Sequence, residues 1–147
     1  MTSKKTGRSP LHTLAILAIQ QGRELSAEIS AKSIVLADSI RRPTLSAVVS
    51  RLAAGEACEE DDISLLETLE EELAARVSIE LISTKVEPYL VGETDDEQIW
   101  STTEVSVYSE HGEQALLLQR SLQRFLETQQ QLVDRAKAER LIGQLLR

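Results

Sequence analysis

The stretch EQALLLQRSLQRFLETQQQLVDRA, residues 113–136, contains the clearest structural signal in the sequence. Its apolar residues return at alternating steps of four and three. The positions that follow this spacing are Leu118, Leu122, Phe125, Gln129, Leu132 and Ala136. Such spacing is typical of an α-helix with a coiled-coil-like seam, in which Gln129 is a polar insert. We therefore predict one long amphipathic C-terminal helix over residues 113–147.

The length of this helix predicts self-association. A helix of about 30 residues is about 45 Å long, whereas a compact chain of this size is about 40 Å across. The helix should therefore project or pair with another chain. We expect a homodimer whose contact residues are Leu118, Leu122, Phe125, Gln129 and Leu132. Pairing within one chain, with a helix over residues 63–73, is the alternative.

Residues 84–110 have the pattern of a β-hairpin. Pro88, Gly92 and a polar run at residues 93–98 interrupt any helix, and residues 102–108 alternate and are rich in β-branched side chains. Three of the four aromatic residues of the chain fall in this segment: Tyr89, Trp100 and Tyr108. We predict that they bind a protein partner, because Trp and Tyr are enriched at interfaces. The alternative is that Trp100 and Tyr108 cover the helical core.

The rest of the chain is predicted to be helical, which gives a mainly α single domain over residues 9–147 after a flexible basic tail at residues 1–8. Residues 9–55 form a basic part with three helices. The first begins at Ser9-Pro10 and is weakened or ended by Gly22, the second covers residues 24–40, and the third begins at Pro43. Residues 56–83 form an acidic helix, whose end at residues 77–83 fits both a helix and a strand.

The charge of the chain is unevenly distributed. Residues 1–55 hold eight Lys and Arg against three Asp and Glu, whereas residues 56–147 hold eight against 21. Within the basic part, residues 25–29 and 42–52 resemble a helix-turn-helix. That resemblance implies contacts with DNA from Arg41, Arg42, Thr44, Ser46 and Arg51. The usual turn glycine is missing and no basic wing follows. An ordinary helical core segment is the other interpretation.

The sequence contains no recognisable catalytic or cofactor motif. His12 and His111 lie far apart without a ligand partner, and the contiguous acids of residues 59–62 do not have calcium-loop spacing. The single cysteine, Cys58, lies among carboxylates that disfavour its thiolate. We therefore expect no catalytic residue, no metal and no cofactor. No apolar run approaches the length of a membrane span, so we expect no membrane insertion.

These features predict a non-enzymatic protein–protein interaction module, such as an adaptor, an assembly factor or a regulatory subunit. A lone free thiol favours the reducing cytoplasm. The alternative is a helix-turn-helix transcription regulator, with a DNA-binding head and an acidic tail that dimerises. An exposed basic face formed by Arg41, Arg42 and Arg51 would favour this alternative.

Overall fold

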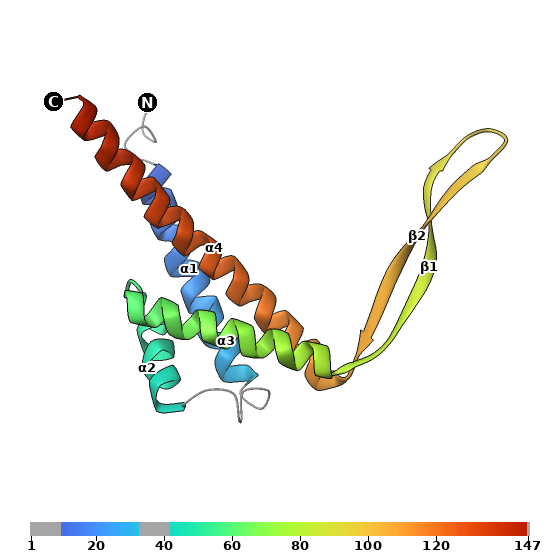
Figure 1. Ribbon diagram of the computed structural model, residues 1–147, viewed down its shortest axis with the longest axis horizontal. Coiled ribbons are helices and arrows are strands. Elements are labelled where there is room, and N and C mark those ends of the chain that lie inside the picture. The colour runs from blue at the N-terminus through green and yellow to red at the C-terminus, as the bar shows by residue number, and fades with distance from the viewer. Residues whose placement is uncertain (1–9, 33–41, 147) are drawn as a thin grey trace.

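The computed structural model describes residues 10–32 and 42–146, and Figure 1 shows their arrangement. The elements are α1 (Pro10–Ala31), α2 (Arg42–Ala53), α3 (Glu60–Ile79), β1 (Leu81–Glu93), β2 (Gln98–Tyr108) and α4 (Glu110–Leu145). The prediction of a mainly α fold with a hairpin and a long C-terminal helix is confirmed. The predicted tail at residues 1–8 lies outside the described residues.

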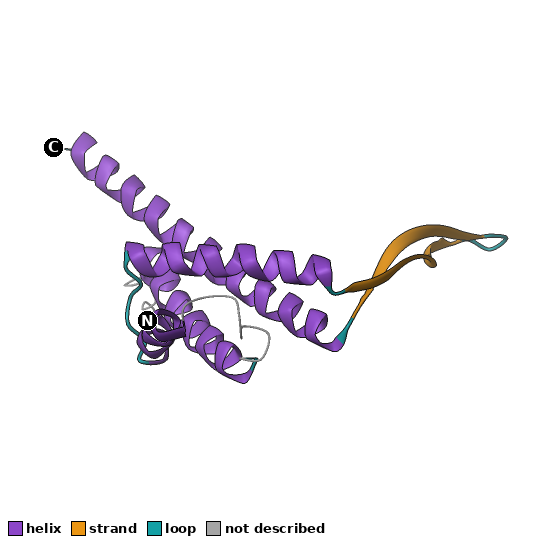
Figure 2. Cartoon of the chain, turned by 60° about the horizontal axis from the view of Figure 1, so that its bottom comes forward, coloured by secondary structure: helices purple, strands orange, loops and turns teal. Residues whose placement is uncertain are grey.

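The four helices of the described part form a body around α4. Helices α1 and α3 both pack on α4, and α2 packs on α1 (Figures 1 and 2). Each helix contributes a stripe of buried aliphatic side chains at helical spacing, as in Leu66, Leu69 and Leu73 of α3. Phe125 of α4 is the largest of the fully buried side chains. The core is therefore aliphatic with one aromatic ring.

Helix α1 continues through Gly22, so the predicted break at this residue is wrong. A Cβ added at Gly22 would lie 3.2 Å from Cδ2 of Leu52 and 3.3 Å from Cε1 of Phe125. The glycine thus allows three helices to approach closely, at a cost of about 1 kcal/mol in helix propensity. The first half of the predicted second helix belongs to α1, and residues 33–40 lie outside the described residues.

The ambiguity at residues 77–83 is settled by the structure. Helix α3 ends at Ile79, and β1 begins at Leu81. The hairpin and α4 begin slightly earlier than predicted, at residues 81 and 110. Helix α4 has 36 residues, which corresponds to a length of about 54 Å. Its start is capped by Ser109, whose Oγ accepts a hydrogen bond from the Gly112 amide at 3.1 Å.

The predicted dimer seam is wrong for its first three residues, because they lie in the core of a single chain. Leu118 and Leu122 have no exposed surface, and Phe125 is 1% exposed. They belong to one cluster with the buried leucines of α3. These side chains are covered by α1 and α3 of the same chain and cannot also pack against a second copy. The intramolecular pairing with α3 therefore replaces the seam.

Candidate interaction surface

The strands β1 and β2 form an arm that extends away from the helical body (Figures 1 and 2). We use the term arm for residues 81–108. The strands pair mainly with each other, and their main contact with the helices is that of β2 with the start of α4. Apart from Val105, Val107, Tyr108 and the bulge glycine Gly92, the residues of both strands are exposed. The arm is therefore an outlying element and not a lid on the core.

The base of the arm is fixed by contacts between Glu80 and Ser109. The Ser109 hydroxyl donates to the Glu80 carboxylate at 2.6 Å, and the Ser109 amide donates to the Glu80 carbonyl at 3.1 Å. Arg76 donates a further hydrogen bond to this carboxylate at 3.2 Å. The hydrogen bond from Ser109, and then the hydrogen bond and charge of Arg76, hold the pKa of Glu80 below its usual range. These contacts join the two ends of the arm to the body.

The pairing register assigns the arm residues to two faces. Tyr89 lies opposite Ser101, and Leu90 lies opposite Trp100. Because successive side chains of a strand point to opposite faces, the Leu90–Trp100 pair and Tyr89 are on different faces. The face of the Leu90–Trp100 pair, which we call the apolar face, carries Val86, Pro88, Leu90 and Trp100 together with Thr102 and Glu104. Trp100 is 56% exposed and Leu90 is 44% exposed.

The structure therefore does not bring the three predicted aromatic residues together. Tyr89 lies on the opposite face from Trp100. Tyr108 lies at the base of the arm, eight residues from Trp100, or about 26 Å along an extended strand. Tyr108 is half-buried and packs against the core, as the alternative interpretation expected, but Trp100 does not cover the core. Sequence reasoning missed Leu90 and Val86, because only the register shows that they accompany Trp100.

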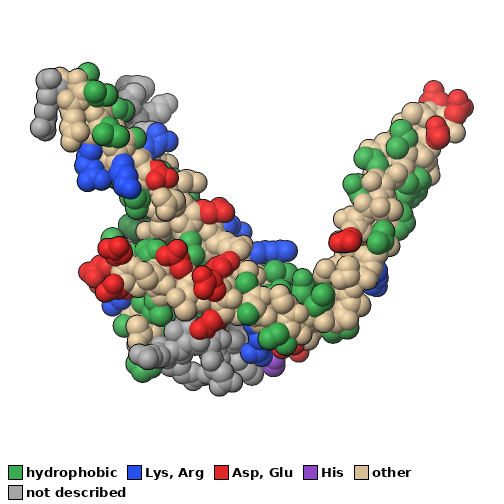
Figure 3. All heavy atoms as spheres, viewed as in Figure 1, with side chains coloured by type: hydrophobic (Ala, Val, Ile, Leu, Met, Phe, Trp, Pro, Cys, Tyr) green, Lys and Arg blue, Asp and Glu red, His purple; other side chains and the backbone are tan. Residues whose placement is uncertain are grey.

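The tip of the arm is acidic. Glu93, Asp95, Asp96 and Glu97 surround the turn, which is closed by a hydrogen bond of 2.7 Å from the Thr94 amide to the Glu97 carbonyl. Figure 3 shows these acids at the end of the arm and apolar side chains along it. Residues 81–108 hold six acids and one base, Lys85. An apolar face and an excess of negative charge thus occur on the same exposed element.

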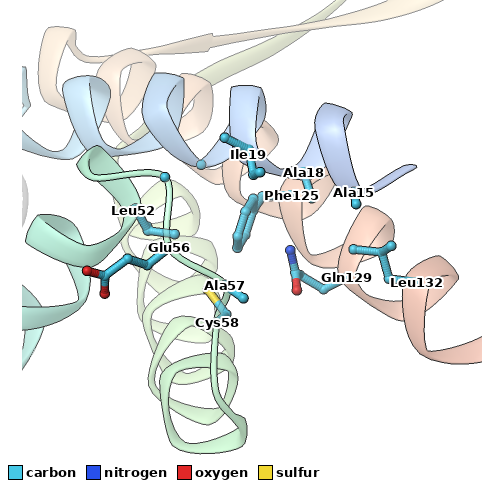
Figure 4. Close-up of a pocket in the computed structure, with 12 residues that line it drawn as sticks. Ala15, Ala18, Ile19, Leu52, Glu56, Ala57, Cys58, Phe125, Gln129 and Leu132 are labelled. Carbon is cyan, nitrogen blue, oxygen red and sulfur yellow. The ribbon is translucent and has the colours of Figure 1, made fainter. Parts of the chain in front are cut away.

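The other end of the predicted seam borders a small cavity between helices. Gln129 and Leu132 line it together with Phe125, Ala18 and Cys58, as Figure 4 shows. Its volume is about 220 Å³. Burial, and then the nearby charge of Asp62, raise the pKa of the Cys58 thiol to about 11. This thiol is consequently protonated and a weak nucleophile at neutral pH.

Of the residues predicted for DNA contact, the structure describes the side chains of Thr44, Ser46 and Arg51. Arg51 donates two hydrogen bonds to the Asp62 carboxylate and is therefore part of an internal ion pair. Thr44 and Ser46 are exposed on α2. Arg41 lies outside the described residues, as does the side chain of Arg42. The guanidinium of Arg51 is thus already engaged by a carboxylate of the same chain.

The described residues contain no group of three or more His, Cys, Asp or Glu side chains that could hold a metal ion. Within the same ranges, no helix combines the length and the apolar character needed to cross a membrane. Comparison of the chain with protein-family models, with curated proteins and with solved structures finds no match. The arm, with its exposed apolar face, is the feature of the structure that stands out as a candidate site.

Proposed function

We propose that the protein is a non-enzymatic protein–protein interaction module of the cytoplasm, an adaptor, assembly factor or regulatory subunit, and that its arm binds the partner. The exposed Leu90–Trp100 pair carries this proposal. Tryptophan is enriched among the few residues that carry most of the binding energy of an interface. Leu90 and Trp100 lie directly opposite each other across the two strands, and contiguous exposed apolar side chains of this kind mark interaction sites.

The position of the arm, away from the helices that could pack on it, supports the same function. A two-stranded hairpin is at best marginally stable in water unless a further strand or a helix packs on it. Here the strands lie beyond the helical body and expose apolar side chains, among them Val86, Leu90 and Trp100. A partner that covers Val86, Leu90 and Trp100 would remove this apolar area from water. The hydrophobic effect favours burial of that kind.

A capture experiment tests the proposal. The tagged chain is used to capture proteins from a nuclease-treated lysate of the source organism, in parallel with the variant Leu90→Ser/Trp100→Ser. Tyr89→Ser, which changes an aromatic residue on the opposite face, is the matched control. We expect a partner that binds the wild type and the control but not the double variant. A partner retained equally by all three would contradict binding through the apolar face, and recovery only without nuclease would favour the DNA-binding alternative.

A further inference from the structure

The two outer edges of the arm differ, and the difference originates at Pro88. Within the described part of the chain the sheet contains only β1 and β2, so each strand has an outer edge without a strand partner. Proline has no amide hydrogen and fits a ladder where the amide points away from the neighbouring strand. The outer edge of β1 therefore lacks a donor in its middle. Such an edge is a poor acceptor of a further strand.

The edge of β2 has no such interruption. Pro88 lies opposite Thr102, so the amide of Thr102 also points outward, because both residues of an antiparallel pair share one hydrogen-bonding state. The same alternation makes the amides of Trp100 and Glu104 face outward. These residues alternate along β2 with those that pair with β1. The β2 edge thus offers a regular row of free donors and acceptors.

Electrostatics restricts what can add to this edge. The arm holds six acids against the single base Lys85, and four of the acids surround the tip. Pairing of two arms would bring two such negative elements together, in a chain whose formal net charge is −8. A strand with Lys or Arg residues instead gains favourable interactions with the same charges. The charge distribution therefore favours a basic partner over a second copy of this chain.

From these three observations we infer that the arm binds a basic protein partner by accepting an extended segment of it as a third strand along the outer edge of β2. This inference rests on the proposed function and adds the edge, the binding mode and the charge of the partner. Strand addition supplies main-chain hydrogen bonds, while side chains beside the added strand give specificity. Trp100 and Thr102 would lie next to the added strand on the apolar face.

Selection from a library of random peptides tests this inference with the full-length chain as bait. Enriched peptides are expected to be basic and to alternate apolar with polar residues. Their affinity should fall about fivefold or more with Thr102→Pro, which removes an outward donor as Pro88 does on β1, because the added strand then loses a main-chain hydrogen bond. Thr102→Val keeps the amide and serves as the control. Circular dichroism verifies that both variants keep the hairpin.

A second measurement does not depend on the variant folding. Each peptide is prepared in two versions, N-methylated either at its odd-numbered or at its even-numbered amides. One version should lose binding and the other should keep it, because only one of these two sets of amides faces β2 in an added strand. The inference is overturned if no peptide is enriched, if the enriched peptides are not basic, or if both methylated versions of a peptide still bind. Dimerisation of the wild type that Thr102→Pro abolishes would overturn it in favour of a second copy. Peptides that bind Thr102→Pro normally but fail with Leu90→Ser/Trp100→Ser would overturn strand addition while leaving the proposed function intact.

Discussion

The guanidinium of Arg51, near the end of α2, donates two hydrogen bonds to the carboxylate of Asp62 in the first turn of α3. Asp62 is buried and also accepts a hydrogen bond from the Glu59 amide at 3.1 Å. One side chain thus joins α2 to α3 and satisfies a backbone donor at the helix start. We expect Asp62→Ala to reduce the free energy of unfolding by about 2 kcal/mol. Asp61→Ala, an exposed neighbour, is the control for urea denaturation.

The same pair predicts how stability depends on pH. The hydrogen bond from Arg51, and then that from the Glu59 amide, lower the pKa of Asp62 in the folded state. In the unfolded chain this pKa is about 3.9. The stabilisation is therefore fully present above that value and is lost as the pH falls through the lower, folded pKa. Urea denaturation of wild type and Asp62→Asn across this acid range measures it. Parallel curves for the two proteins would contradict the assignment.

Substitution of Leu122 distinguishes a role in the core of one chain from a role in a dimer seam. Its side chain has no exposed surface within one chain, so Leu122→Ala should reduce the free energy of unfolding by about 2–5 kcal/mol. Leu117→Ala, on the exposed side of the same helix, should change it by no more than about 0.5 kcal/mol. Light scattering alongside denaturation distinguishes the two roles. A dimer that dissociates in Leu122→Ala while the helical signal persists would restore the seam.

The difference between prediction and structure at α4 has a physical cause. The spacing of apolar residues showed that one face of the helix is buried, and the structure confirms a long helix there. A periodic pattern does not specify whether the covering surface belongs to the same chain or to another. The expected projection of the helix came from its length alone. Helices α1 and α3 cover the apolar face in the first half of this helix, where Leu118, Leu122 and Phe125 are buried, so that part of the face requires no second chain.

The same limit applies to the arm and to Gly22. Alternation and turn residues predicted the hairpin, but the face of each side chain depends on the register, which is set by the turn and by irregularities near Leu81 and Leu90. The pairing of Leu90 with Trp100 could not be predicted without it. Propensity alone favoured a helix end at Gly22, whereas tertiary packing against Phe125 keeps the helix continuous.

Gly22 itself provides a test of this packing. A methyl group at this position would press on Leu52 and Phe125, but both side chains border the cavity of about 220 Å³ and can shift into it. The gain in helix propensity is about 1 kcal/mol. Gly22→Ala should therefore leave the free energy of unfolding within about 1 kcal/mol of the wild type. Gly22→Val, with a branched Cβ, should be clearly destabilised in the same thermal denaturation experiment. Equal stability of both variants would show that the helices are not in close contact here.

Cys58 should react slowly with alkylating reagents. Its pKa of about 11, compared with 9.0 for an unperturbed cysteine, lowers the thiolate fraction at neutral pH about 100-fold, and the thiolate is the reactive form. The reaction rate with iodoacetamide should rise about tenfold per pH unit up to that pKa. A small-molecule thiol measured in parallel is the reference. Cys58→Ser should leave both the fold and partner binding unchanged, and a loss of binding would reveal a role for this thiol.

Trp100 and Tyr108 both belong to β2, but we expect their substitution by alanine to affect the stability of the protein differently. Trp100 is exposed on the apolar face, so Trp100→Ala should change the melting temperature very little. Tyr108 packs against the core at the base of the arm, and Tyr108→Ala should cost about 1–2 kcal/mol, as is usual for loss of a half-buried side chain. Calorimetry of both variants gives the comparison. If Trp100→Ala is destabilised as much as Tyr108→Ala, then Trp100 supports the fold of the arm itself. The binding role proposed for the apolar face would then rest on Leu90 and Val86 alone.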